Sequence, residues 1–126
     1  MTDPTADDQS LMAALRQELT ACAGRGETVT YRDLAARVDF PGPHSIHRLT
    51  ELLEQLIRED HSAGRPLLAT LAVSRAQKGM PGRGFFQLLT ELGRYRGPDQ
   101  GAEAAAHHAR EREAARVHWA ARPPRD

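Results

Sequence analysis

The residues from Val29 to Ile57 constrain the fold more than any other part of the chain. Apolar residues recur there at helical spacing twice, first over 31–38 and then over 46–57. The segment DFPGP at 39–43 separates the two patterns and cannot continue a helix, because its prolines lack a backbone donor and disfavour helical geometry in the residues before them. The sequence therefore predicts a helix, a tight turn and a second helix, which is the layout of a helix-turn-helix.

Local signals support both helices. Thr30 is a suitable N-cap for the first, and Asp33 stands three residues later, at the spacing of a capping box. The second helix is expected over residues 44–60. Its predicted buried stripe is Ile46, Leu49, Leu52, Leu53, Leu56 and Ile57.

The remaining elements follow from shorter patterns. A helix is expected from Ser10, with Gly24 and Gly26 ending it, after a flexible tail at 1–9. Residues 67–74 alternate with a period of two, which predicts a strand. A glycine-rich loop follows, and we expect Phe85 and Phe86 to form a short return strand before a helix that ends at Gly93; the alternative is that the helix begins at Phe85 itself.

This order of elements predicts an α+β fold that is mostly helical and winged-helix-like, with a helix-turn-helix, a short β-hairpin and an added C-terminal helix. The winged-helix-like domain would span 10–96, followed by a linker at 97–102. An alanine-rich helix is expected at 103–120, docked through Val117 and Trp119 and frayed near Ala104–Ala106, with a flexible tail at 121–126.

Composition narrows the class of protein. The chain has 126 residues, with 17 basic and 17 acidic side chains, so its zero net charge argues against a protein that coats nucleic acid non-specifically. No apolar run is long enough to cross a bilayer and the N-terminus is unlike a signal peptide, so we expect a cytoplasmic protein that does not bind membranes. Cys22 falls on an apolar helix face, which favours a small buried hydrophobe over a nucleophile.

Basic side chains are nevertheless concentrated locally. From Arg65 to Arg96 there are six basic residues and one acidic residue. Three of the six, Arg75, Lys78 and Arg83, belong to the loop 75–84 and are expected to face phosphates. In the second predicted helix, four acidic residues outnumber two arginines, so only its first turns suit DNA. The expected contacts there are His44, Ser45, His47 and Arg48.

The segment GETVTYRDLAARVDFPG resembles the part of alkylguanine DNA alkyltransferases and alkyltransferase-like proteins that precedes their recognition helix. The resemblance implies that Tyr31 opens the first of the two helices and contacts the DNA backbone. Because the chain lacks the Pro-Cys-His-Arg signature of their active site, it implies DNA-binding architecture without alkyl transfer. A longer likeness, from VTYRDLA through GRPLLATLAVSR to KGMPGRGFF, is to a group of small bacterial proteins of no known activity that share a PGxGFF-like loop.

Neither a metal nor a cofactor is predicted. His44 and His47 have i, i+3 spacing, but a zinc site needs three or four converging ligands, so we expect the histidines to be solvated at the surface. The loop GMPGRG matches neither a Walker sequence nor a dinucleotide-binding motif, and no serine has a nucleophile context. The sequence therefore predicts a protein that is not an enzyme and has no catalytic residues.

Two functions follow from these features. The first is a DNA-binding protein, such as a transcriptional or phage/defence-related regulator, that uses helix 44–60 and the basic loop 75–84. The second is a protein–protein interaction module or adaptor on the same scaffold. Element order and the basic loop favour DNA binding, whereas net neutrality favours a protein partner; the sequence gives no oligomeric state.

Overall fold

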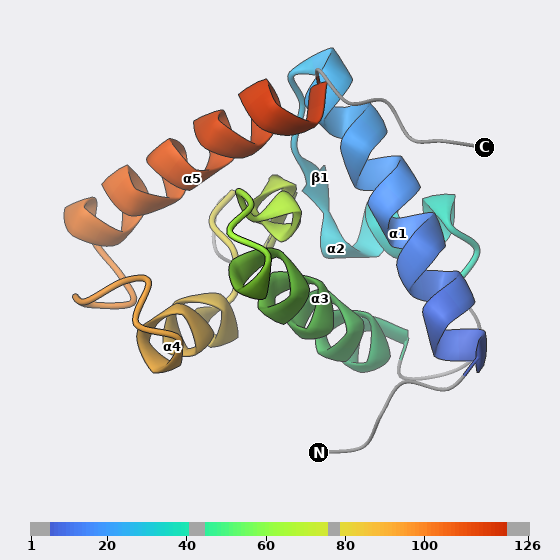
Figure 1. Cartoon of the computed structure of the whole chain (residues 1–126), viewed down its shortest axis with the longest axis horizontal. Coiled ribbons are helices and arrows are strands. Elements are labelled where there is room, and N and C mark those ends of the chain that lie inside the picture. The colour runs from blue at the N-terminus through green and yellow to red at the C-terminus, as the bar shows by residue number, and fades with distance from the viewer. Residues whose placement is uncertain (1–5, 41–44, 76–78, 121–126) are drawn as a thin grey trace.

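The computed structural model describes residues 6–40, 45–75 and 79–120 (Figure 1). The flexible tail expected at 121–126 and the first five residues of the tail expected at 1–9 lie outside this range. Within it, the chain forms α1 (Ala6–Arg25), β1 (Val29–Thr30), α2 (Tyr31–Arg37), α3 (Ser45–Ser62), a 3₁₀ helix η1 (Leu68–Leu71), β2 (Ala72–Val73), α4 (Arg83–Glu91) and α5 (Ala102–Ala120). The fold is mostly helical with a small sheet, which confirms the expected α+β class.

The two central helices form as their local signals predict. Thr30 caps α2, because its hydroxyl oxygen accepts a hydrogen bond from the backbone N–H of Asp33 at 3.1 Å. The helix ends where Asp39 adopts a left-handed backbone conformation, with φ of 56°. α3 runs slightly past the predicted 44–60 and buries most of its apolar stripe; Ile46 is the exception and is exposed. α2 and α3 contact each other, although residues 41–44 between them lie outside the described structure.

The prediction of a strand over 67–74 is wrong for most of that segment. Residues 68–71 form η1, whose turn is closed by the N–H and the hydroxyl of Thr70, which both bond to the carbonyl of Leu67. All residues from Leu67 to Val73 are buried, so the alternation of residue types did not mark one buried and one exposed face. Only Ala72 and Val73 are a strand, and it pairs in parallel with β1.

The predicted β-hairpin does not form among the described residues. Phe85 and Phe86 belong to α4, which confirms the alternative rather than the return strand. Both rings are buried together with Leu88 and Leu89, a spacing that suits a helix and not a strand with one buried face. Among the described residues, Ser74 forms an isolated antiparallel bridge with Met80, which lies within the loop 75–84.

The first helix begins earlier than predicted and is ended by Gly26, as predicted. α1 begins at Ala6, so residues 6–9 are helical and not part of a flexible tail, and the buried side chain of Asp8 is held against the fold. At the other end α1 passes through Gly24 and stops at Arg25, because the left-handed conformation that ends it is adopted by Gly26, with φ of 68°.

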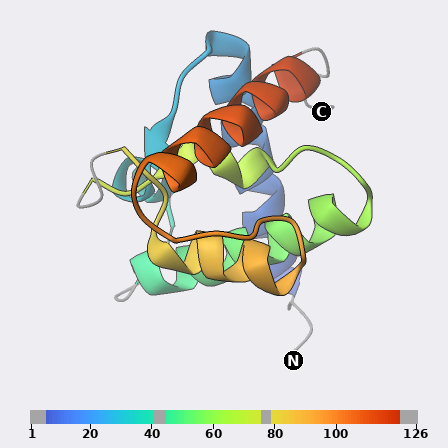
Figure 2. The same ribbon diagram turned by 90° about the vertical axis from the view of Figure 1, so that its left-hand side faces the viewer.

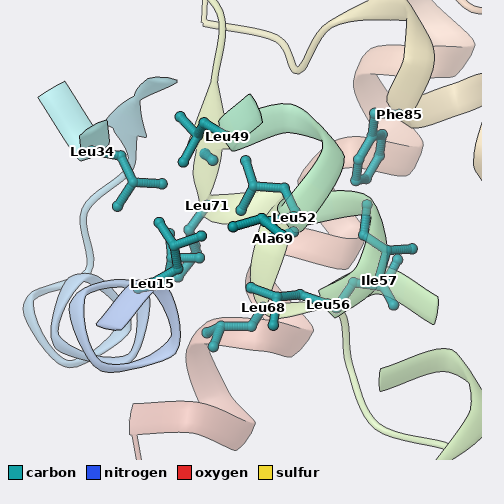
Figure 3. Packing of buried hydrophobic residues seen from close by; sticks show 14 of the residues in the cluster. Leu15, Leu34, Leu49, Leu52, Leu56, Ile57, Leu68, Ala69, Leu71 and Phe85 are labelled. Atoms are coloured by element: carbon teal, nitrogen blue, oxygen red, sulfur yellow. The ribbon is translucent and has the colours of Figure 1, made fainter. Parts of the chain in front are cut away.

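The core is built around η1, which contacts α1, α3 and α5. Figure 2 shows η1, in yellow-green, between α5 on one side and α3 with α4 on the other. Leu15 of α1, Leu56 of α3 and Leu68 of η1 are fully buried and meet in this layer (Figure 3). None of the described helices is long and apolar enough to cross a membrane.

The C-terminal helix docks through one of its two expected anchors and through a residue that was expected to fray. Val117 is 57% exposed, so this anchor is wrong, and Ala104 is 0% exposed and belongs to the core, so the predicted frayed end is wrong as well. The small side chain of Ala104 lets the helix backbone approach the core closely. Trp119 does dock in part, because its indole N–H donates to the carbonyl of Pro66 at 3.0 Å.

Candidate DNA-binding surface

A surface groove lies where the first turns of α2 and α3 meet the end of β2. Its volume is about 760 Å³. The groove is lined by Thr30, Tyr31, Arg32, Asp33, Ile46, Ser74 and Arg75. The parallel pairing of β1 with β2 creates this juxtaposition, since it sets Thr30, the cap of α2, beside Val73, which precedes Ser74 and Arg75.

Tyr31 connects α2 to the loop before α4. Its hydroxyl oxygen accepts a hydrogen bond from the backbone N–H of Gly82 at 2.9 Å. Burial raises the pKa of this phenol, while the Gly82 bond acts in the opposite direction with a smaller effect. Tyr31 therefore stays protonated near neutral pH, and its own O–H is left to donate to a further acceptor.

The groove carries two arginines and one carboxylate, Asp33, so its described side chains have a positive balance. Arg32 and Arg75 are both exposed and form no ion pair or hydrogen bond within the described residues. Many other arginines do have a carboxylate partner, namely Arg16, Arg25, Arg37, Arg48, Arg58, Arg65, Arg94 and Arg116. Arg96, Arg110 and Arg112 have no such pair either, but they lie on or just before α5 and do not line the groove.

The first turns of α3 support only part of the predicted interface. His47 extends into solvent, with 81% of its side chain exposed and its Nε2 3.4 Å from Glu51 Oε1. Arg48, predicted to read bases, instead forms an ion pair with the carboxylate of Asp8 on α1 and does not line the groove. Its guanidinium is therefore paired within the fold, which does not favour a base-reading role for Arg48.

The other predicted contacts are less defined. His44 and Lys78 lie outside the described residues. Ser45 is the first residue of α3 and Arg83 the first of α4, but their side chains are outside the description too. Of the eight predicted site residues, the structure thus places Tyr31 and Arg75 on one groove, with His47 on the helix whose Ile46 lines it.

Sequence reasoning missed Arg32 and Ile46 as groove residues. Arg32 comes directly after Tyr31 and does not lie on the apolar face of α2. This position indicates that Arg32 is exposed, but it does not indicate a groove. Ile46 was assigned to the buried stripe because its spacing matches that stripe. Its exposure follows from its position in the first turn of α3, where the helix extends beyond the core.

The features that would suggest catalysis do not assemble into a site among the described residues. Cys22 is fully buried, which confirms its predicted place in the core, and burial raises the pKa of its thiol despite the nearby Arg25 and Arg37. No group of three or more His, Cys, Asp or Glu side chains that could hold a metal ion occurs in the described ranges.

Comparisons with protein-family models, with curated proteins and with solved structures found no match to this chain.

Proposed function

We propose that this chain is a DNA-binding protein that uses α2 and α3 as a helix-turn-helix. The observation that carries the proposal is the pair of unpaired arginines, Arg32 and Arg75, on the groove that also contains Tyr31. Guanidinium groups and a free phenol O–H are suited to phosphate oxygens, which position a protein on a duplex without reading its sequence.

The same geometry suggests how the interface is divided. Arg32, Arg75 and Tyr31 would contact the phosphate backbone, joined by Lys78 and Arg83 of the loop. His47, in the first turn of α3, would face the bases, as the sequence also predicts for His44 and Ser45. This division explains why a chain with zero net charge can bind DNA, because the local charge at the groove is positive even though the total is balanced.

The test is a fluorescence-anisotropy titration of a labelled duplex between 50 and 200 mM KCl. The double variant Arg32→Ala with Arg75→Ala should weaken binding about tenfold or more at low salt, since two charge-assisted contacts are lost. It should also reduce the dependence of log affinity on log salt concentration by about 2, because each phosphate contact contributes roughly 0.9 to that slope.

The matched control is Arg96→Ala with Arg110→Ala. It removes the same charge from exposed arginines that do not line the groove, so binding should stay close to wild type. Wild-type protein that binds no duplex in a salt-sensitive way would overturn the proposal. Equal losses in the groove and control variants would do the same, since the effect would then be general charge and not this site.

A second function, binding to a protein partner, is favoured by the exposed face of α3. Beyond its first turn this face presents Glu51 and Glu54, whose negative charge repels phosphates. This acidic side of α3 lies next to a small cavity.

A further inference from the structure

Tyr31 lines a second hollow in addition to the groove. This cavity has a volume of about 210 Å³ and lies between α3, η1 and the start of α4. Gly82 and Gly84 form part of its rim, and neither has a side chain to fill it. The cavity is thus open to an occupant from outside the chain.

The walls of the cavity are apolar and fixed by the core. Leu53 and Ile57 of α3 and Phe85 of α4 contribute side chains that are nearly fully buried. The Phe85 ring packs edge-to-face against Phe86, with ring centroids 5.2 Å apart. Figure 3 shows Ile57 and Phe85 together at one edge of the apolar cluster, so this surface exists before any ligand binds.

Glu54 is the charged side chain on the lining among the described residues. It is exposed and has no ion-pair partner in the described part of the chain. The cation one turn along α3, Arg58, is directed instead to Glu91 of α4, with Arg58 Nη2 2.7 Å from Glu91 Oε2. Within the described residues, the carboxylate of Glu54 is therefore open to a cation from another molecule.

The size of the cavity and the chemistry of its lining together indicate which kind of group fits into it. Pockets for drug-sized ligands run from roughly 300 to 1,000 Å³, so this cavity suits a single side chain better than a whole cofactor. Apolar walls with two aromatic rings, from Tyr31 and Phe85, and a carboxylate at the edge favour a cationic head on an apolar stem.

We propose that this cavity receives a lysine or arginine side chain from an exposed segment of a partner protein, with Glu54 pairing its charge. Glu51, exposed one turn earlier on α3, extends the acidic surface on which the rest of a basic segment would lie. The proposal does not depend on DNA binding, because neither Arg32 nor Arg75 lines the cavity.

The experiment is an NMR titration of ¹⁵N-labelled protein with capped peptides Ac-Gly-Gly-Xaa-Gly-Gly-NH₂, where Xaa is lysine, arginine, norleucine or glutamate. The lysine or arginine peptide should shift the amide signals of Gly82 and Gly84. The norleucine peptide has the apolar stem without the charge. It should bind at least about tenfold more weakly than the lysine peptide, as expected when a charged hydrogen bond is lost.

Glu54→Gln should weaken binding of the basic peptide by a similar factor, whereas the matched control Glu103→Gln, at an exposed site on α5 that does not line the cavity, should leave it within about twofold. Both residues are exposed, so thermal melts should match wild type. The comparison of lysine with norleucine peptides uses wild-type protein alone and therefore tests the proposal even if a variant misfolds. Equal binding of norleucine, an unaffected Glu54→Gln variant, or shifts of Gly82 and Gly84 by a deoxynucleotide but by no peptide would each overturn it.

Discussion

At the scale of single residues, buried polar groups hold the helices in place. Asp60 at the end of α3 is fully buried; its carboxylate accepts hydrogen bonds from the backbone N–H of Leu68 and from Arg65, and lies 3.0 Å from Arg16 Nη1. The ring of Trp119 packs against both guanidinium groups, at 5.7 Å from Arg16 and 5.6 Å from Arg65. This cluster links α1, α3 and α5, and nothing in the local sequence around Asp60 indicates it.

His108 corrects the expectation that the histidines are solvated. It is fully buried on α5, and its Nε2–H donates to the carbonyl of Thr70 at 2.9 Å. Burial is the main cause that lowers the pKa of this imidazole, with Arg112 and His107 adding to it; the Thr70 bond and Glu111 act the other way. The folded protein thus holds His108 neutral under conditions where an unfolded chain would already protonate it.

The consequence is a loss of stability in acid. In the unfolded chain an imidazole takes up a proton as pH falls through about 6.5, whereas the folded state does so only at lower pH, so the free energy of unfolding should fall in that window. Urea unfolding at pH 7.5 and 5.5 measures the difference. His108→Gln should show a smaller drop than wild type, and His47→Gln, at an exposed site, should show the wild-type drop. Stability that does not fall towards pH 5.5 would contradict the assignment.

At the scale of helices and strands, a prediction agrees with the structure when the sequence pattern behind it depends only on neighbouring residues. The Thr30 cap and the apolar stripe of α3 depend on neighbours a few residues away; the cap formed as predicted, and so did the stripe except at Ile46. The predictions of a strand at 67–74 and of a hairpin were wrong. Segment 67–73 is buried on both faces, and that burial depends on contacts with α1, α3 and α5, which are distant in the sequence. On α5, an alanine-rich pattern with no apolar stripe gave no indication of which face would be buried.

The face of α5 that packs on the core can be tested with two neighbouring alanines. Ala104 is fully buried and Ala105 is exposed. Ala104→Leu should destabilise the protein by about 1 to 3 kcal/mol, the range for forcing extra volume into a packed site. Ala105→Leu should change stability by less than about 0.5 kcal/mol, as exposed substitutions do. Denaturant unfolding monitored by circular dichroism gives both values; a larger loss for Ala105→Leu would mean that the helix is rotated from this position.

The candidate site shows the same limit. Tyr31 and Arg75 were predicted from the sequence and lie on one groove. Arg48 was predicted as well, but its partner Asp8 is far away in the sequence, so no local pattern could reveal that its charge is already paired. Glu54 was seen only as one of several acidic residues, because a cavity between three elements is a property of the packed structure.

At the scale of the whole molecule, the first and last helices complete one core. α1 and α5 contact each other directly, and Ala104 of α5 belongs to the same apolar cluster as Leu15 and Leu19 of α1 (Figure 1). The C-terminal helix is thus part of the domain and not an appendage to it, and the described residues should unfold as a unit.

This unity predicts coincident unfolding transitions. Trp119 fluorescence reports the end of α5, where the indole bonds to Pro66, and far-ultraviolet circular dichroism reports all helices together. In urea both signals should give the same midpoint, as for a two-state domain. The native emission should be shifted to shorter wavelength than that of a solvated indole, because the ring is partly buried. A Trp119 transition at clearly lower urea would show that α5 detaches first.

The parallel pairing of β1 with β2 also has a consequence for the order of folding. Val29 pairs with Ala72 and Thr30 with Val73, so this short ladder closes a loop that contains α2 and α3 entirely. Loop-closure entropy opposes such a pairing until the intervening chain is compact, whereas each helix can begin to form from contacts within itself. The groove, whose Tyr31 and Arg75 adjoin the two strands, is therefore among the last features to be assembled and among the first to be lost when the chain opens.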